Sequence, residues 1–311
     1  MVKLAVAGGT GGFGRTLVGE LASVKENDVL PTALFMHLTN VEIAVTDYKD
    51  EETLTEIMLS HKIETVVSSL NPPLPEVFDR ECTLVKAASK ASVKRFAPSQ
   101  FAIDYEKDDD HLPLSWKSGK QQVINELRKH PNLEWTLFLN GYFMDYWAQP
   151  HLSAHMVPET PFIDIAAGEA SIPGAKGNVK VAFTMTRDVA KFITKAVMCN
   201  DKWPEKSYII GDKMTFDEIV AAAEKARDMK FKVTYNKEED LRVGKIEPIP
   251  TWIALWDRYP RAIFDEMFSA FGLSMVLGDT DFDYDTSLNA KFREIETTKI
   301  TALIQKYCSK R

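Results

Sequence analysis

The stretch VKLAVAGGTGGFGRTLVGELA, residues 2–22, decides the fold of this 311-residue chain. Its first six residues form a short apolar run, which is typical of a buried parallel strand. The glycine-rich segment Gly8 to Gly14 follows directly, and Leu17, Val18 and Leu21 then recur at helical spacing. A strand, a glycine turn and a helix in this order predict the opening of a dinucleotide-binding βαβ unit.

The glycine turn fits both GxGxxG (Gly9, Gly11, Gly14) and GxxGxxG (Gly8, Gly11, Gly14). Glycine lets the backbone turn sharply and approach a pyrophosphate, and the helix N-terminus offers N–H groups and a positive dipole end. The alternative is a tight turn kept for helix–sheet packing in a fold that no longer binds a cofactor. The cofactor-binding candidates in this turn are Gly8, Thr10, Gly11, Gly12, Phe13 and Gly14.

The end of the second strand usually selects between NAD and NADP, through an acid for the ribose hydroxyl or an arginine for the 2′-phosphate. Here residues 34–38 read LFMHL, which contains neither, and His37 is the candidate contact. Arg15 and Lys25 are the nearest cations in sequence. The residues alone therefore leave the choice between the two cofactors open.

Strands and helices go on alternating to residue 139, which predicts a doubly wound parallel sheet, an α/β fold. We expect residues 1–150 to form an NAD(P)-binding Rossmann domain and residues 151–311 a smaller α+β substrate-binding region. A helix at 187–199 should pack back on the first domain. Further strands are expected at 30–36, 41–45, 65–69, 95–97, 134–139 and 207–210, and helices at 51–59, 76–91, 118–129, 216–226 and, interrupted by Pro260, 252–271.

Composition excludes several classes of protein. The formal charge of −7 argues against binding to a nucleic-acid backbone, because that requires a positive face. No uncharged stretch is long enough for a membrane span, and the N-terminus lacks a signal-peptide layout. The three widely spaced cysteines predict no disulfide framework, so we expect a cytoplasmic protein. His151 and His155 lack further ligands at zinc-type spacing, so no metal site is expected.

Five segments together resemble the isoflavone-reductase-like, NmrA-like branch of the short-chain dehydrogenase superfamily, and most of all its fungal members. The resemblance implies NADPH bound along the carboxyl ends of the strands, with NADH left open, and an apolar substrate in the cleft between the two regions. We expect a monomer or homodimer. The segments are GGTGGFGR at 8–15, VKRFAPSQFAIDY at 93–105, WTLFLNGYFMDY at 135–146, TRDVAKFI at 186–193 and SYIIGDKMTFDEIVAAAEK at 207–225.

Reductases of this family carry a lysine near the start of a helix, and Lys120 in Lys120-Gln121-Gln122-Val123 matches that pattern. An ammonium beside a nicotinamide can polarise a carbonyl, steady the ribose or donate a proton. Lys117 is its rival, and a solvated lysine is the ordinary alternative. The Tyr-x-x-x-Lys of the wider superfamily is broken, because Trp116 stands in the tyrosine's place. Either Lys120 acts itself or another donor serves.

The ends of three further strands supply the remaining candidates. Tyr142 is the second catalytic candidate, although it and Tyr146 could equally be wall residues. Ser99 lies in a segment similar to the family's Pro-Ser-Glu-Phe, where it could bind a ligand or only stabilise a turn, and Gln100 replaces the acid. The cofactor-binding candidates are Ser69, Leu70, Ser99, Gln100, Phe101, Lys120, Asn140, Tyr142 and Phe143.

These observations favour an NADPH-dependent reductase of an apolar aromatic or polyketide-like molecule, with a place in secondary metabolism, and two alternatives stay open. One alternative is a regulatory protein that senses NAD(P) without turning it over. The other is a non-redox isomerase or cyclase that uses the same cleft. The missing tyrosine and the missing second-strand arginine fit the first alternative, and the missing arginine also fits the second.

Overall fold

The computed structural model describes residues 2–23, 27–31, 41–70, 76–107, 117–148, 151–152, 155–156, 160–257 and 260–309. His37, Trp116 and most of the strand expected at 30–36 lie outside these residues. Within them, no helix is both long and apolar enough to cross a bilayer.

A parallel sheet forms the first half of the molecule, in the order β2-β1-β3-β4-β5. The chain leaves this ladder at Thr136 and continues as β6, which pairs in parallel with a strand from much later in the sequence, β11. The doubly wound α/β arrangement expected from the sequence is confirmed. The strands are β1 (Val2–Ala7), β2 (Asn27–Pro31), β3 (Thr65–Ser68), β4 (Arg95–Ala97), β5 (Glu134–Trp135), β6 (Leu137–Leu139) and β11 (Lys206–Tyr208).

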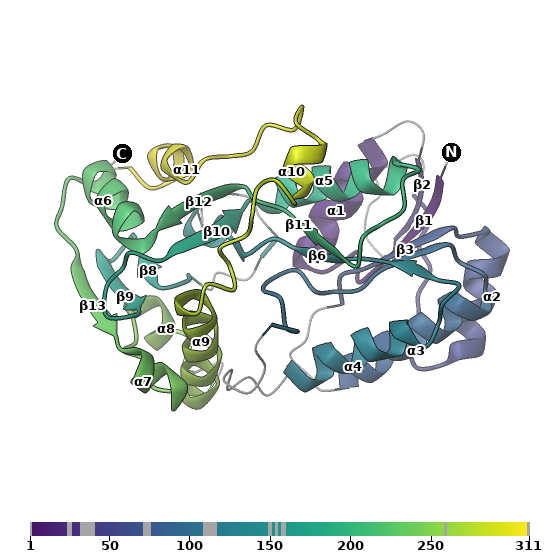
Figure 1. Ribbon diagram of the computed structural model, residues 1–311, viewed down its shortest axis with the longest axis horizontal. Coiled ribbons are helices and arrows are strands. Elements are labelled where there is room, and N and C mark those ends of the chain that lie inside the picture. The colour runs from purple at the N-terminus through teal and green to yellow at the C-terminus, as the bar shows by residue number, and fades with distance from the viewer. Residues whose placement is uncertain are drawn as a thin grey trace.

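Helices cover both faces of this sheet (Figure 1). On one face α1 packs against α5, and their apolar side chains meet Leu4, Val6 and Phe138 of the strands. On the other face α2, α3 and α4 enclose Val66 and Phe96. The parallel strands are therefore buried on both sides. The helices are α1 (Gly12–Ser23), α2 (Glu51–His61), α3 (Glu76–Lys90), α4 (Lys117–Arg128) and α5 (Thr186–Met198).

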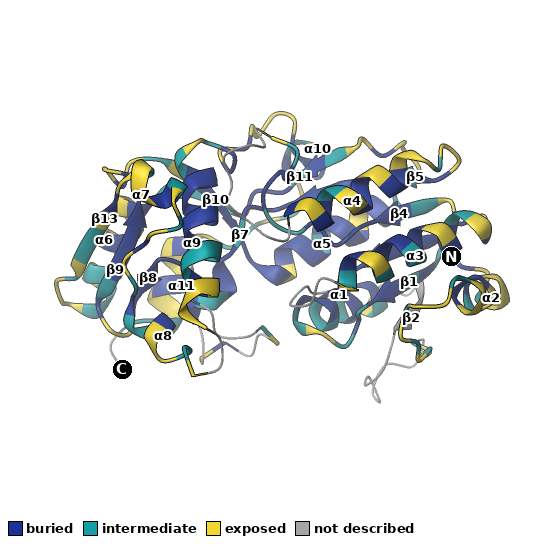
Figure 2. Ribbon diagram, turned by 90° about the horizontal axis from the view of Figure 1, so that it is seen from below, coloured by how far each residue is buried: buried dark blue, intermediate teal, exposed yellow. Residues whose placement is uncertain are grey.

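The second half is α+β and has its own aromatic core. Trp252 stacks on Phe268 at 4.0 Å between ring centroids, and Phe162 meets both rings edge-on. Figure 2 shows its strands at residues 163–164, 169–173 and 180–184 largely buried and the outer side of the helix Glu238–Arg242 exposed. Its strands are β7 (Tyr142–Phe143), β8 (Ile163–Asp164), β9 (Glu169–Pro173), β10 (Lys180–Thr184), β12 (Asp212–Thr215) and β13 (Lys232–Asn236); its helices are η2 (Met144–Ala148), α6 (Phe216–Arg227), α7 (Glu238–Arg242), α8 (Pro250–Ile253), α9 (Arg261–Val276) and α11 (Ile300–Tyr307).

Two sequence-based expectations about secondary structure were wrong. Residues 41–45 form no strand: Val41 makes an isolated bridge, and Ile43 and Val45 are 44% and 86% exposed. Their alternating apolar pattern is thus not used for burial against the sheet. The helix expected at 252–271 is divided, because Pro260 caps the start of α9 and α8 ends at Ile253. Proline lacks the N–H that a continuous helix needs and constrains the residue before it.

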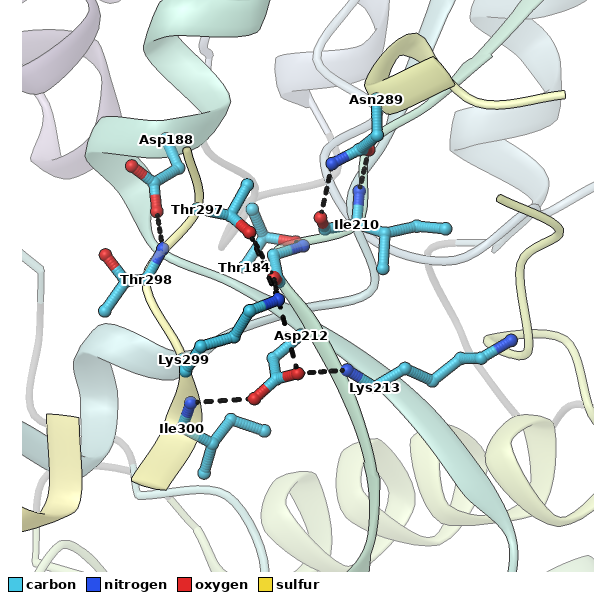
Figure 3. A network of polar contacts seen from close by, with 11 residues as sticks. Thr184, Asp188, Ile210, Asp212, Lys213, Asn289, Thr297, Thr298, Lys299 and Ile300 are labelled. Carbon is cyan, nitrogen blue, oxygen red and sulfur yellow. Dashed lines mark hydrogen bonds and ion pairs between the residues drawn. The ribbon is translucent and has the colours of Figure 1, made fainter. Parts of the chain in front are cut away.

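The C-terminal segment returns to the first half of the molecule. Leu288, in α10 (Leu288–Lys291), and Phe292 pack into the core formed by α1 and α5. Figure 3 shows the polar contacts that hold the segment in place. The Asp188 carboxylate accepts the Thr298 N–H at 2.7 Å, and Asp212 accepts the Ile300 N–H at 3.0 Å.

Asn289 links this segment to Ile210 through two hydrogen bonds. Its side-chain oxygen accepts the Ile210 N–H at 2.9 Å, and its side-chain nitrogen donates to the Ile210 carbonyl at 2.7 Å. Asn289→Ala should lower the free energy of unfolding by about 2–3 kcal/mol, because it leaves two buried backbone groups without partners. Urea denaturation measures this. Arg293→Ala, an exposed change just beyond the same helix, should stay within about 0.5 kcal/mol of the parent; equal effects of the two would contradict the prediction.

Candidate active site

The glycine turn connects β1 to the N-terminus of α1. Gly8 has a φ of 71°, a left-handed conformation that glycine adopts without strain. The Gly11 N–H donates to the Gly8 carbonyl at 2.9 Å, and the Gly8 N–H donates to the Tyr48 hydroxyl at 3.1 Å. The N–H groups of the first turn of α1 have no acceptor within the helix. The turn therefore presents a backbone surface suited to an anion.

Close packing holds this turn against the end of β3. A Cβ atom placed on Gly14 would lie 2.2 Å from the Gly8 carbonyl oxygen and 2.7 Å from the Ser69 hydroxyl. Both the backbone N–H and the hydroxyl of Ser69 donate to the Ala7 carbonyl at 2.8 Å. The turn and the candidates Ser69 and Leu70, which are both buried, are thus side by side.

Aromatic rings join the turn to the ends of β4 and β6. Phe13 lies 4.6 Å from Phe101 and 5.3 Å from Phe143, measured between ring centroids. The Gly141 N–H donates to the Ala102 carbonyl at 3.1 Å, which ties the two strand ends to each other. Candidates from residues 13, 101 and 143, far apart in the sequence, therefore lie in one region of the structure.

Lys120 is buried in the first turn of α4, with 6% of its surface exposed. Its ammonium donates to the Ser99 carbonyl and lies 5.9 Å from the centre of the Phe78 ring. Burial lowers the pKa of this ammonium below its usual value, and the negative charge of Glu81 opposes that change. Lys117, the rival, is buried to the same extent. A solvated lysine, the ordinary alternative, is therefore excluded for both positions.

Two buried amide side chains that follow strands of the sheet carry polar atoms without partners among the described residues. The Gln100 side-chain nitrogen donates to the Lys120 carbonyl at 3.2 Å, whereas its side-chain oxygen has no hydrogen bond. Neither side-chain atom of Asn140, at the end of β6, has one. Buried polar atoms normally find partners, so these atoms indicate a place where a ligand or water completes the site.

Tyr142, half-buried, lies toward the second half of the molecule. Its ring is 5.5 Å from Phe271, 6.0 Å from Tyr146 and 6.3 Å from Phe162, measured between centroids. These contacts give Tyr142 the position of a wall residue between the strand ends and the aromatic core. They leave its role as a proton donor a prediction.

The sequence analysis missed Glu81. This acid is 1% exposed on α3, and its carboxylate accepts the Ser99 N–H at 2.7 Å. The signal was present, because Glu81 falls three residues after Phe78 and four before Val85, on the apolar face of the helix. The site therefore contains a buried carboxylate, that of Glu81, although position 100 carries the amide of Gln100.

The segment that carries His155 lies against the glycine turn. A Cβ atom on Gly12 would meet the His155 carbonyl oxygen at 2.9 Å and the Met156 sulfur at 3.1 Å. His151 is exposed. Across the ranges that the structure describes, no three His, Cys, Asp or Glu side chains gather as a metal site would require.

Comparison with known proteins places the chain among reductase-like folds. The NmrA-like family matches residues 2–296. An oxidoreductase, BOA1, of the fungus Botryotinia fuckeliana is 34% identical over 252 residues, which are 79% of this chain and 80% of that protein. Leucoanthocyanidin reductase of Vitis vinifera, in a binary complex with NADPH, has a similar structure with a TM-score of 0.76, 19% identity, and coverage of 98% of this chain and 99% of that one. AtPrR2 with NADP⁺ and (+)-pinoresinol gives a TM-score of 0.75, 18% identity and 98% coverage of both chains.

Proposed function

The chain belongs to the NmrA-like family, and from that premise we propose that it is an NADPH-dependent reductase of an apolar aromatic or polyketide-like small molecule. One observation carries the proposal: a buried lysine donates to the Ser99 carbonyl just after β4, next to Gln100, whose buried side-chain oxygen has no partner among the described residues. Fungal relatives that are named oxidoreductases support it.

The residues present fit a bound dinucleotide. Glycine at positions 8 and 14 lets α1 pack closely against the end of β3, which places the N-terminus of α1 at the strand ends, where a pyrophosphate would bind. The unpartnered amides of Gln100 and Asn140 offer both donors and acceptors for a carboxamide or ribose. NADPH is the cofactor that the NADPH- and NADP⁺-bound structural neighbours carry, and we assign it here on that basis.

The reaction we propose transfers a hydride, supplied by NADPH, to an electron-poor carbon, and a proton completes the product. The Lys120 ammonium uses one of its three N–H groups on the Ser99 carbonyl, so the others can stabilise or protonate the negative charge that develops on the substrate. Tyr142 is the second candidate donor. The segment from Ser99 to Phe101, with Asn140 and Phe143, orients the cofactor.

An apolar substrate suits the aromatic wall next to the site. Tyr142 is the half-buried member of this wall, backed by the buried rings of Phe162 and Phe271, and apolar surfaces of this kind hold ligands mainly through apolar contact. AtPrR2, whose structure contains the aromatic ligand (+)-pinoresinol, supports the same class of acceptor. We propose that the acceptor is phenolic or polyketide-like and that the enzyme acts in secondary metabolism in the cytoplasm.

Titration of the purified protein with NADPH, NADH and their oxidised forms, by calorimetry or nicotinamide fluorescence, tests this proposal first. We expect micromolar binding of NADPH, followed by loss of its absorbance when (+)-pinoresinol or other phenolic acceptors are added. Binding with no turnover of any acceptor would favour the sensing protein. Conversion of an acceptor without loss of NADPH would favour an isomerase, and failure to bind any nucleotide would overturn the reductase.

A further inference from the structure

The side chains of Glu81 and Lys120 both form hydrogen bonds with the backbone of one residue, Ser99. The Ser99 N–H donates to the Glu81 carboxylate at 2.7 Å, and the Ser99 carbonyl accepts from the Lys120 ammonium. Both side chains are almost completely buried. The chain here makes two successive tight turns, in which Gln100 N–H donates to the Pro98 carbonyl and Ala102 N–H to the Gln100 carbonyl, each at 2.8 Å. The positions of the acid, the turn and the lysine are therefore linked.

A buried carboxylate without a counter-charge is costly, and so is a buried ammonium. In the described part of the chain, Glu81 on α3 is the charged group whose field acts on the Lys120 ammonium. The neighbours that contact Lys120 from the β4 end, Ser99 and Gln100, are uncharged, and from its own helix α4 the nearest cation in sequence is Lys117. Because the attraction between two charges is mutual, each member of the pair partly offsets the cost of burying the other.

The amide at position 100 fits this arrangement. Its nitrogen donates to the Lys120 backbone carbonyl at 3.2 Å, which an ionised carboxylate could not do. A glutamate here would face that carbonyl oxygen with its own negative charge. The negative charge for the ammonium therefore comes from α3 instead of from the turn.

We propose that Glu81 is a positioning residue. It supplies the counter-charge that keeps Lys120 protonated, and it fixes the turn at Ser99 whose carbonyl accepts the hydrogen bond of that lysine. The proposal rests on the reductase function proposed above, because it concerns the same lysine. Glu81 touches neither substrate nor cofactor in this scheme. Its effect is transmitted through Lys120 and through the backbone of Ser99.

Melting temperatures of single and double variants at pH 7 test the pairing without any assay of activity. Glu81→Gln keeps an oxygen to accept the Ser99 N–H but removes the charge, and Lys120→Met keeps the length of the stem. We expect Lys120→Met to lower the melting temperature of the parent, since it leaves the Glu81 carboxylate alone. In the Glu81→Gln background the same change should raise it, since it removes an ammonium that has lost its partner.

Two control variants separate pairing from general destabilisation. Asp164→Asn changes a buried carboxylate of β8, which accepts the Ala167 N–H at 2.9 Å in the other half of the molecule. Lys120→Met should lower the melting temperature equally with and without Asp164→Asn. Glu81→Asp retains the charge, so Lys120→Met should again lower it. The proposal would be overturned if Lys120→Met lowered the melting temperature equally in the parent and in Glu81→Gln. It would also be overturned if Glu81→Asp folded while neither Glu81→Gln nor the double variant of Glu81→Gln with Lys120→Met did so.

The pH dependence of NADPH oxidation gives a second readout, which a merely structural role would not move. Loss of the Glu81 charge should lower the pKa of Lys120 further, so the alkaline loss of activity should begin at lower pH in Glu81→Gln. Glu81→Asp should keep the parent profile, and a parent-like profile in Glu81→Gln would contradict the proposal. If the parent reduces no acceptor, the reductase assignment fails, and the melting temperatures still decide whether Glu81 and Lys120 form a pair.

Discussion

Replacing Lys120 by methionine should lower the rate of NADPH-dependent reduction by about 10²–10⁴-fold, the usual contribution of a positioned acid or charged group. The ammonium is buried, and its hydrogen bond to the Ser99 carbonyl holds it beside the candidate cofactor contacts. Methionine keeps the length of the side chain but offers no N–H to a developing negative charge. The binding of NADPH, measured by calorimetry, should change far less than the turnover.

Two companion variants assign the role among the candidates. Lys117→Met changes the rival, which lies three residues earlier on α4 and is equally buried. Tyr142→Phe removes a hydroxyl but keeps the ring that contacts Phe271 and Phe162. A large loss in Lys117→Met with a small one in Lys120→Met would show that the wrong lysine was chosen. A comparable loss in Tyr142→Phe would make that tyrosine the proton donor and leave Lys120 an electrostatic role.

Alanine at Gly14 should weaken NADPH binding by about 10- to 100-fold, because the added methyl group must displace part of the glycine turn. The methyl carbon would lie 2.2 Å from the Gly8 carbonyl oxygen and 2.9 Å from the Gly9 Cα. Both are backbone atoms, which cannot rotate away as a flexible side chain could. Overpacking of this kind costs about 1–3 kcal/mol. If the turn relaxes in the free protein, cofactor binding must restore the strained geometry, and the same energy appears as lost affinity.

Gly19 supplies the matched control, because it lies in the same helix and an added Cβ meets no atom within 4 Å. Gly19→Ala should leave NADPH binding unchanged and stabilise the protein by up to about 1 kcal/mol, since alanine is the better helix former. Calorimetric titration and urea denaturation of both variants provide the measurements. Parent-like affinity in Gly14→Ala would mean that the close approach of α1 to the turn is not required for the cofactor.

The architecture of the first half could be predicted because its signals are local. Apolar runs, helical spacing or glycine placement within a few residues predict each of the elements β1, α1, α3, β4 and α4. The predicted strand at 41–45 shows the limit of this reasoning. Alternation of apolar residues indicates a strand only where the sheet offers a partner, and Val45 is instead exposed.

The candidate site was predictable as a set of strand ends. Parallel strands bring their carboxyl ends to one edge, so glycine, serine and asparagine residues at those ends were expected near one another. In the structure, Phe13 of the glycine turn meets Phe101 and Phe143, which follow two of these strands. Their binding of a cofactor stays a proposal. Glu81 escaped prediction because a glutamate within a helix normally faces solvent, and only its position against Ser99 gives it a partner.

By itself the sequence determined most elements of the parallel sheet and its helices, the glycine turn and the family, because each depends on neighbouring residues or on short motifs. The tertiary structure alone decided that Glu81 and Lys120 hold the same turn, and that Leu288 and Phe292 complete a core begun by Leu4. These contacts join residues tens to hundreds of positions apart. Local pattern cannot specify them, because the burial and the charge that stabilise them exist only after the chain has folded.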